Sequence, residues 1–256
     1  MDNVAKVKTN WDYSRLAYAY VKRPDYSSQA IEKIYDITNS KPGQKVCDVG
    51  AGVGHLTLHH AKRGLDIVAI EPNDEMRTIG IKRTEPFNNV VWYEAKGEDT
   101  KQSSRSFDLV TFGSSFNVTD RQLALKETSR ILKHGGWFVC VWNHRILDDP
   151  IQKNIEDIIK TKLVDYNYGS RREDQTKVIE ESGLFDKVEK VEGEMIHSQT
   201  VADCIEAWRS HATLERQAGC EFSVIINNVE DYLNSLHKES IHIPYITRAW
   251  VARKNG

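Results

Sequence analysis

The chain has 256 residues, 39% hydrophobic and 28% charged, which is ordinary for one globular core with or without a cap. Its formal net charge is −2, whereas nucleic-acid binders usually carry an excess of basic residues, so we expect no nucleic-acid partner. The amino terminus is polar and no apolar run approaches the ~18 residues of a membrane span, which predicts no membrane partner and a cytoplasmic location. The four cysteines lack metal-ligand spacing, and we expect no metal site.

Strands and helices alternate through the first part of the chain. A helix with apolar residues at helical spacing ends at Lys41-Pro42-Gly43. The strands that follow are predicted at about 45–50, 66–70, 90–93, 107–112 and 137–142, and the helices between them at 54–63, 73–83 and 120–133. We place His59 and His60 on the surface of the first of these helices. Strand, helix, strand at this spacing indicates a parallel sheet covered on both faces.

The alternation breaks after residue 142. The patterns predict helices around 149–165 and 172–182, a strand at 185–191, two helices within 200–237 and a last strand at about 241–253. In an open sheet, ligands bind at the carboxyl ends of the strands. We therefore expect a helical cap insertion, at about 196–237, to lie over that end.

A glycine-rich turn directly follows the first strand. It reads Gly50-Ala51-Gly52-Val53-Gly54, and Glu71 stands at the end of the next strand. Such glycines allow close approach of the backbone to a ligand, the following helix points free N–H groups at it, and an acid at Glu71 accepts both hydroxyls of a ribose. The pair predicts a nucleotide-like cofactor.

The spacing of this turn disfavours a dinucleotide. A dinucleotide site needs G-x-G-x-x-G/A, but the third small residue is replaced here by His55. Asp48, two residues before the first glycine, suits a ligand that carries an ammonium group, although shaping the turn is an alternative role. An NAD-dependent oxidoreductase is therefore the least favoured reading.

The turn resembles motif I of class I S-adenosylmethionine-dependent methyltransferases. Four further segments, in order, are similar to those of a bacterial group of small-molecule methyltransferases: 20–26, 71–72, 116–120 and 142–145. The resemblance implies S-adenosyl-L-methionine as cofactor and S-adenosyl-L-homocysteine as product. It also implies an α/β, Rossmann-like, seven-stranded, mostly parallel sheet whose antiparallel last strand lies between the fifth and sixth, plus the helical cap.

The same resemblance implies one domain over residues 1–256. Its core covers about 28–195 and 238–256, and an N-terminal lid at about 8–27 folds over the bound cofactor. The candidate cofactor-binding residues are Tyr20, Arg23, Asp48, Gly50, Ala51, Gly52, Glu71, Pro72, Met76, Gly97, Glu98, Gly113 and Phe116.

Several of these candidates have a specific expected role. Arg23 pairs with the cofactor carboxylate, and the backbone around Gly97 contacts the edge of the adenine. Met76 packs on the adenine or belongs to the core. At the end of the fourth strand, a carbonyl near Gly113 takes the methionine ammonium and the ring of Phe116 closes over the sulfonium.

Methyl transfer by in-line displacement depends mostly on positioning, and it needs a base only when the acceptor carries a proton. His144, just past the fifth strand, is the first candidate for that base, with a surface or capping role as the alternative. Asn117 is a candidate for orienting the substrate. It replaces a histidine usual in the group, so that histidine's role does not carry over. In the cap, Arg209 and His211 are candidates for contacts with an acidic substrate.

The leading interpretation is a cytoplasmic enzyme that methylates a small molecule, with oxygen as the expected acceptor atom. The only expected partner is this small-molecule substrate, and the protein is a monomer or a homodimer. Two alternatives stay open: methylation of a tRNA base, and binding of S-adenosylmethionine without catalysis. The second is motivated by the replaced residues after the fourth strand.

Overall fold

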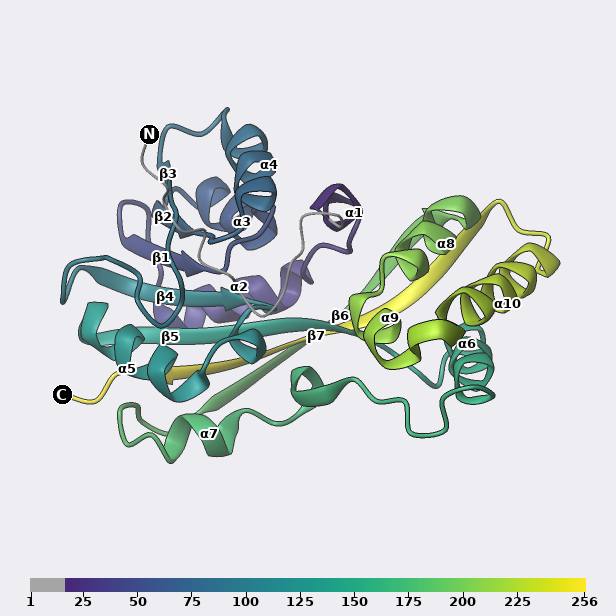
Figure 1. Ribbon diagram of the computed structural model, residues 1–256. Helices are drawn as coiled ribbons and strands as arrows, with labels where there is room; N and C mark the ends of the chain where they lie inside the picture. Colours follow the sequence, from purple (N-terminus) through teal and green to yellow (C-terminus); the bar gives the residue numbers. More distant parts are fainter. Residues whose placement is uncertain (1–16) are drawn as a thin grey trace, which may run out of the picture.

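The computed structural model describes residues 17–256, and their centre is one seven-stranded sheet (Figure 1). The strand order is β3-β2-β1-β4-β5-β7-β6. The strands are β1 (Lys45–Val49), β2 (Asp66–Ile70), β3 (Val90–Tyr93), β4 (Phe107–Gly113), β5 (Leu132–Arg145), β6 (Glu189–Thr200) and β7 (Ser240–Arg253). Neighbours from β3 to β5 pair in parallel, whereas β7 is antiparallel to both β5 and β6. The predicted fold class and the position of the last strand are confirmed.

Helices cover both faces of the sheet, which explains why its central strands read as continuous apolar runs. One face packs on α2 (Ser28–Thr38) and α3 (His55–Lys62), and the other on α5 (Arg121–Ile131) and α7 (Thr176–Glu180). At the edge, α4 (Asp74–Thr84) packs against β3. The three helices predicted between strands 1 and 5 are present within three residues of their expected ends.

A second hydrophobic core lies where β6 and β7 run out beyond the other strands (Figure 1). The cap helices pack there: α6 (Pro150–Lys160), α8 (Val201–Arg209), α9 (Ala212–Ala218) and α10 (Phe222–Ser235). Where the sequence predicted two helices after residue 200, the structure has three, and α6 joins them. Within residues 17–256, no helix is long and apolar enough to cross a membrane.

Two strands are longer than predicted. β6 continues to Thr200, with exposed side chains alternating with less exposed ones, so it lacks the apolar run that marks a buried strand. β5 begins at Leu132, which pairs with Phe107 of β4. It continues to Arg145 because it pairs with β7 as far as Tyr245. This extension of β5 carries its last residues to the edge of the cap.

Part of the expected lid belongs to the described structure. α1 (Ala17–Val21) lies between the core helices and the cap helices and contacts α4 (Figure 1). Lys22 Nζ donates to Asp203 Oδ1 at 2.6 Å, which links this segment to α8. Residues 8–16 of the expected lid lie outside the described residues.

A buried hydrogen-bond network lies beneath the glycine turn. The hydroxyls of Thr57 and Thr111 donate to Asp48 Oδ2 at 2.6 Å and Oδ1 at 3.0 Å. Since the Thr111 proton goes to Asp48, His60 Nε2 donates to Thr111 Oγ1 at 3.1 Å, and His60 Nδ1 accepts from the Tyr35 hydroxyl at 3.0 Å. His60 is 1% exposed, so its predicted place on the surface was wrong. Its ring is neutral in this network.

Acidification should destabilise the protein through His60. Burial, reinforced by His59, lowers the pKa of His60 to about 3. Below pH ~6.5 the unfolded chain takes up a proton that the folded chain does not, so stability falls by up to about 1.4 kcal/mol per pH unit towards pH 3. Burial raises the pKa of Asp48 to about 6. Between that pH and its ordinary pKa, Asp48 therefore has the opposite effect and stabilises the folded chain as the pH falls.

Urea denaturation at pH 7.5, 6.5 and 5.5 measures the effect of His60. We expect the free energy of unfolding to decline less steeply with falling pH in His60→Asn than in the wild type. Equal slopes would contradict a neutral, buried His60.

Candidate active site

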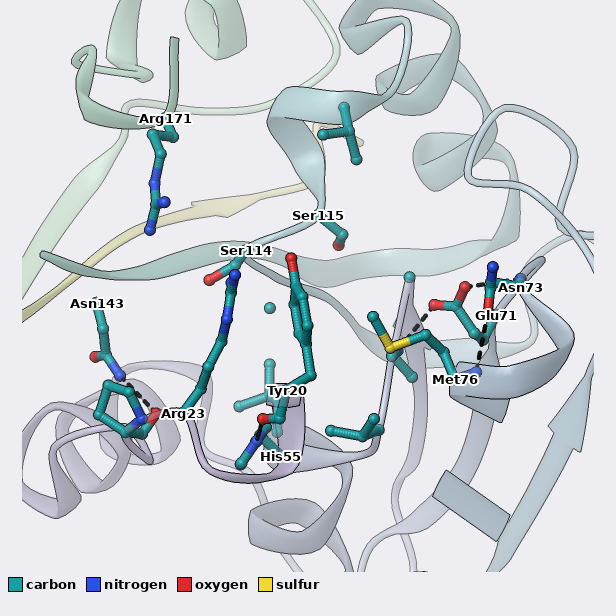
Figure 2. A pocket seen from close by; sticks show the side chains of 18 of the residues that line it. Tyr20, Arg23, His55, Glu71, Asn73, Met76, Ser114, Ser115, Asn143 and Arg171 are labelled. Atoms are coloured by element: carbon teal, nitrogen blue, oxygen red, sulfur yellow. Dashed lines mark hydrogen bonds between the residues drawn. The ribbon is translucent and has the colours of Figure 1, made fainter. Parts of the chain in front are cut away.

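A cavity of about 650 Å³ opens at the carboxyl ends of β1, β2 and β4 and extends beneath the cap helices. Its walls fall into two parts. The core half consists of the segments that follow β1, β2, β3 and β4, together with the N-terminal segment at 19–26. The cap half consists of the end of β5, the loop at 168–172, the end of β6, Tyr245 of β7, and α8 with the two residues that follow it. Figure 2 shows side chains from both halves pointing into the same space.

The glycine turn forms the floor of the core half. Gly50, Gly52 and Gly54 have φ angles of 66°, 58° and 83°, which favour glycine. A Cβ on Gly50 would lie 2.5 Å from the Cβ of Ser115, whereas nothing lies within 4 Å of one on Gly52. The turn therefore packs on the end of β4 at Gly50 and leaves its backbone open to the cavity at Gly52.

Gly50→Ala should damage both stability and cofactor binding. The substitution adds the strain of a positive φ, about 1–2 kcal/mol, to the displacement of Ser115. Gly43→Ala is the matched control, because Gly43 also has a positive φ but has nothing within 4 Å of its would-be Cβ. We expect both variants to unfold at a lower temperature than the wild type. Titration with S-adenosylhomocysteine should show weaker binding only in Gly50→Ala. Normal binding by Gly50→Ala would mean that the cofactor does not depend on this turn.

Glu71 stands beside the turn with its carboxylate held by two backbone N–H groups (Figure 2). The N–H of Gly52 donates to Oε2 and that of Asn73 donates to Oε1, each at 2.9 Å. Glu71 is 7% exposed, and its burial raises its pKa. A carboxylate has about four acceptor sites, so two remain for the hydroxyls of a ribose. The residues present thus fit the ribose of the expected cofactor.

Asp48 also lines the cavity, but both of its oxygens already accept from threonine hydroxyls. It is fully buried beneath the turn. These contacts support the turn-shaping role that the sequence left open beside the ligand-binding one.

The other candidate cofactor residues, with one exception, also line the cavity. They are Tyr20, Arg23, Ala51, Pro72, Met76, Gly97, Glu98 and Gly113. Met76 belongs to a small apolar cluster with Ala17 and Val53. The guanidinium of Arg23 lies 3.5 Å from the ring centroid of Tyr20.

Phe116 and Asn117 are corrections to the predicted site, because neither is among the described residues that line the cavity. Phe116 is fully buried, with its ring centroid 5.4 Å from those of Phe112 and Phe138. Asn117 Oδ1 accepts from Trp142 Nε1 at 2.9 Å. Both side chains stabilise the core behind the site, and the turn at Ser114 and Ser115 faces the cavity instead (Figure 2).

His144 is the third correction. Its neighbours on β5, Asn143 and Arg145, line the cavity, and since side chains alternate along a strand, His144 points to the opposite face. It is 2% exposed, and neither ring nitrogen has a hydrogen-bond partner among the described residues. Burial, with the nearby charge of Arg172, lowers its pKa to about 3. His144 therefore has neither the position nor the basicity expected of the base.

The cap half contains side chains that the sequence did not single out. These are Asn143, Arg145, Tyr168, Arg171, Arg172, Gln199 and Tyr245. Arg145 stood at the end of the segment 142–145, which was the only signal for it. Of the two cap candidates, His211 lines the cavity, whereas Arg209 forms ion pairs with Glu206 and Glu230 at 2.6 Å.

Comparison with known proteins finds methyltransferases, both by family model and among individual relatives. A family model described as the ubiE/COQ5 methyltransferase family matches residues 27–163. An uncharacterized methyltransferase of Mycobacterium tuberculosis is 32% identical over 123 residues, 48% of each chain. A ubiquinone/menaquinone biosynthesis C-methyltransferase UbiE of Vibrio vulnificus is 28% identical over 165 residues, 59% of this chain and 62% of that one. The matches thus span about half to three-fifths of these relatives.

Solved structures share the fold at low sequence identity. Haemonchus contortus phosphoethanolamine N-methyltransferase 2, in complex with phosphomonomethylethanolamine and S-adenosylhomocysteine, superposes with a TM-score of 0.54 and 15% identity, covering 94% of this chain and 57% of that one. The YcgJ protein of Bacillus subtilis gives a TM-score of 0.56 and 14% identity, with coverages of 89% and 98%. At such identities the likeness establishes the fold alone, and the substrate has to be inferred from the residues of the site.

Proposed function

The chain belongs to the ubiE/COQ5 methyltransferase family, and from this premise we propose that it transfers a methyl group from S-adenosyl-L-methionine to a small-molecule acceptor. The expected resemblance to class I methyltransferases is confirmed by the family match and by the fold of the structural neighbours. The observation that carries the proposal is the carboxylate of Glu71, fixed by the backbone of Gly52 and Asn73 at the mouth of the glycine turn.

The described residues divide the work of binding. We propose that Glu71 accepts from the ribose, that the open backbone at Gly52 approaches the methionine part, and that Met76 covers the adenine; the fixed carboxylate, the free space at Gly52 and the position of Met76 in the cavity wall support these roles. Arg23, which lies over the ring of Tyr20 and lines the cavity, is proposed to pair with the carboxylate of the cofactor. A cavity of about 650 Å³ lies within the roughly 300–1,000 Å³ of small-molecule sites and leaves the cap half for an acceptor.

Methyl transfer depends mainly on the alignment of the acceptor atom with the methyl group. When bound, the cofactor supplies a methyl group on a positively charged sulfur. The protein aligns the acceptor with that methyl group and excludes water, and such positioning supplies much of the rate of a displacement. The cap helices roof the cavity, and the bridge between Lys22 and Asp203 ties the N-terminal segment to that roof.

As the acceptor atom we propose oxygen, while the names of the UbiE relatives specify carbon and make it the second candidate. We also propose a cytoplasmic location, no nucleic-acid partner, and a monomer or homodimer. The formal net charge of −2 supports the absence of a nucleic-acid partner.

Transfer of a labelled methyl group tests the proposal. The purified protein is incubated with methyl-labelled S-adenosylmethionine and, in parallel, with a small-metabolite extract, total tRNA and total protein. We expect label in the metabolite fraction, and mass spectrometry of the product then distinguishes a methyl on oxygen from one on carbon. Label only in tRNA or protein would contradict a small-molecule acceptor. Tight cofactor binding without transfer to any pool would instead support the non-catalytic alternative.

A further inference from the structure

We propose that Arg145, Arg171 and Arg172 form a subsite for an oxyanion, a carboxylate or phosphate group, of the acceptor substrate. The inference rests on the proposed function and narrows its substrate class to anionic small molecules. The three arginines line the cap half of the cavity, whereas Glu71 and the glycine turn line the core half.

Arg171 is the central residue of this subsite. It lies in the 3-10 turn η3 (Gly169–Arg172). Its side chain points into the cavity, towards the wall that carries Arg23 (Figure 2). It makes no ion pair or hydrogen bond with any described residue. Burial, followed by repulsion from Arg23, lowers its pKa. The guanidinium is thus placed among other cations with its donors unused.

Arg145 and Arg172 are held in position by neutral groups. Arg145 Nε donates to the Tyr245 hydroxyl at 3.0 Å, and its guanidinium lies 4.2 Å from the ring centroid of Trp208. Arg172 Nη2 donates to the carbonyl of Arg145 at 2.8 Å and lies 4.4 Å from the ring centroid of Tyr168. Each contact uses one N–H or an aromatic face, so the other donors of both guanidinium groups remain available.

The nearby carboxylates accept from groups other than the three arginines, and of them Glu156 acts on Arg172 through its charge without pairing with it. Asp203 pairs with Lys22 and Glu206 with Arg209, both at 2.6 Å, and Glu156 accepts from the Tyr168 hydroxyl. In residues 17–256, none of the three arginines has a carboxylate within ion-pair distance. Partly buried cations without a counter-ion are costly, and an anionic guest removes that cost.

A neutral donor completes the subsite. His211 Nδ1 accepts from the N–H of Leu214 at 3.2 Å, and burial keeps its pKa well below the ordinary value. The proton of the neutral ring is therefore on Nε2, where it serves as a donor. Planar guanidinium groups match the oxygens of a carboxylate or phosphate by paired hydrogen bonds, which also fix the orientation of the guest. Such anchoring at the far end would hold the acceptor atom in line with the methyl group.

The test uses calorimetry on protein saturated with S-adenosylhomocysteine, at constant ionic strength, with benzoate and inorganic phosphate as probes. We expect at least one probe to bind the wild type and to bind Arg171→Gln about tenfold or more weakly, the scale of a lost charge-assisted hydrogen bond. Arg105→Gln makes the same charge change at an exposed residue that does not line the cavity, and it should bind within about twofold of the wild type, since exposed charges contribute little. Preference for benzoate assigns a carboxylate substrate, and preference for phosphate a phosphorylated one.

Three results would overturn the subsite. The first is equal probe affinity in the wild type and Arg171→Gln, and the second is no binding of either probe. The third is that Arg171→Gln binds S-adenosylhomocysteine about tenfold more weakly but binds 5′-methylthioadenosine, which lacks the carboxylate, as well as the wild type does, because Arg171 would then serve the cofactor. Failure of the proposed function is visible separately, as failure of S-adenosylhomocysteine to bind the wild type. The probes are then titrated into the free protein, where the same comparison decides the subsite.

Discussion

Glu71→Ala is expected to lower the affinity for S-adenosylhomocysteine by about 1–3 kcal/mol, roughly 5- to 150-fold. The variant loses the two acceptor sites assigned to the ribose. It also leaves the N–H groups of Gly52 and Asn73 without their present partner, which loosens the turn that approaches the cofactor. Calorimetric titration measures the loss directly.

Glu75→Ala is the control for this variant. Glu75 is exposed at the start of α4 and does not line the cavity. Its substitution therefore removes a carboxylate of the same kind close to the cavity without changing the cavity wall. We expect its affinity to equal that of the wild type. If folded Glu71→Ala also bound within about twofold, a margin of less than 1 kcal/mol, Glu71 would have no role in cofactor binding.

Phe116→Ala is expected to lower the free energy of unfolding by about 3–5 kcal/mol, as large-to-small changes in a packed aromatic core do. Phe116 is fully buried between Phe112 and Phe138. Because its ring does not face the cavity, the affinity of the folded fraction for S-adenosylhomocysteine should not change. Urea denaturation and calorimetry measure the two quantities.

Two further variants make this result decisive. Leu123→Ala removes a 49% exposed side chain from the nearby α5, and we expect it to cost less than about 0.5 kcal/mol. Phe116→Leu keeps most of the core volume. If Phe116→Leu were nearly as stable as the wild type but bound S-adenosylhomocysteine about tenfold more weakly, the ring would contact the cofactor after all.

The sequence predicted the features that depend on neighbours along the chain. Apolar runs predicted the observed bounds of β2 and β3. β2 is mostly buried, as expected of a parallel strand covered on both faces, whereas β3 lies at the sheet edge with half-exposed side chains. The glycine turn and Glu71 follow directly from two strand ends, and their local geometry supports the predicted roles. The place of β7 between β5 and β6 came from the family resemblance and was confirmed.

The errors concern side chains whose direction is set by distant partners. His144 faces away from the cavity because β5 continues past its apolar run, pairing Asn143 with Thr247 and His144 with Ile246. That register fixes the alternation, and nothing near residue 144 specifies it. Asn117 likewise points to Trp142, 25 residues further along the chain.

His60 and Arg171 illustrate two other limits. A histidine on a short helix reads as polar surface, and only Tyr35 and Thr111, from other elements, satisfy its ring inside the core. Arg171 lies in the short 3-10 turn η3, where too few residues repeat for periodicity to indicate which side chains turn inward. The cap half of the cavity is assembled from segments between residues 143 and 245, so its charge is apparent only in three dimensions.

The central claim is that the cavity binds S-adenosylmethionine through Glu71 and the glycine turn. Calorimetric titration of the wild-type protein with S-adenosylmethionine, S-adenosylhomocysteine and NAD tests it most directly. We predict dissociation constants on the order of micromolar for both sulfur compounds, about −8 kcal/mol, and no detectable binding of NAD. Tight binding of NAD, or no binding of either sulfur compound, would contradict the claim.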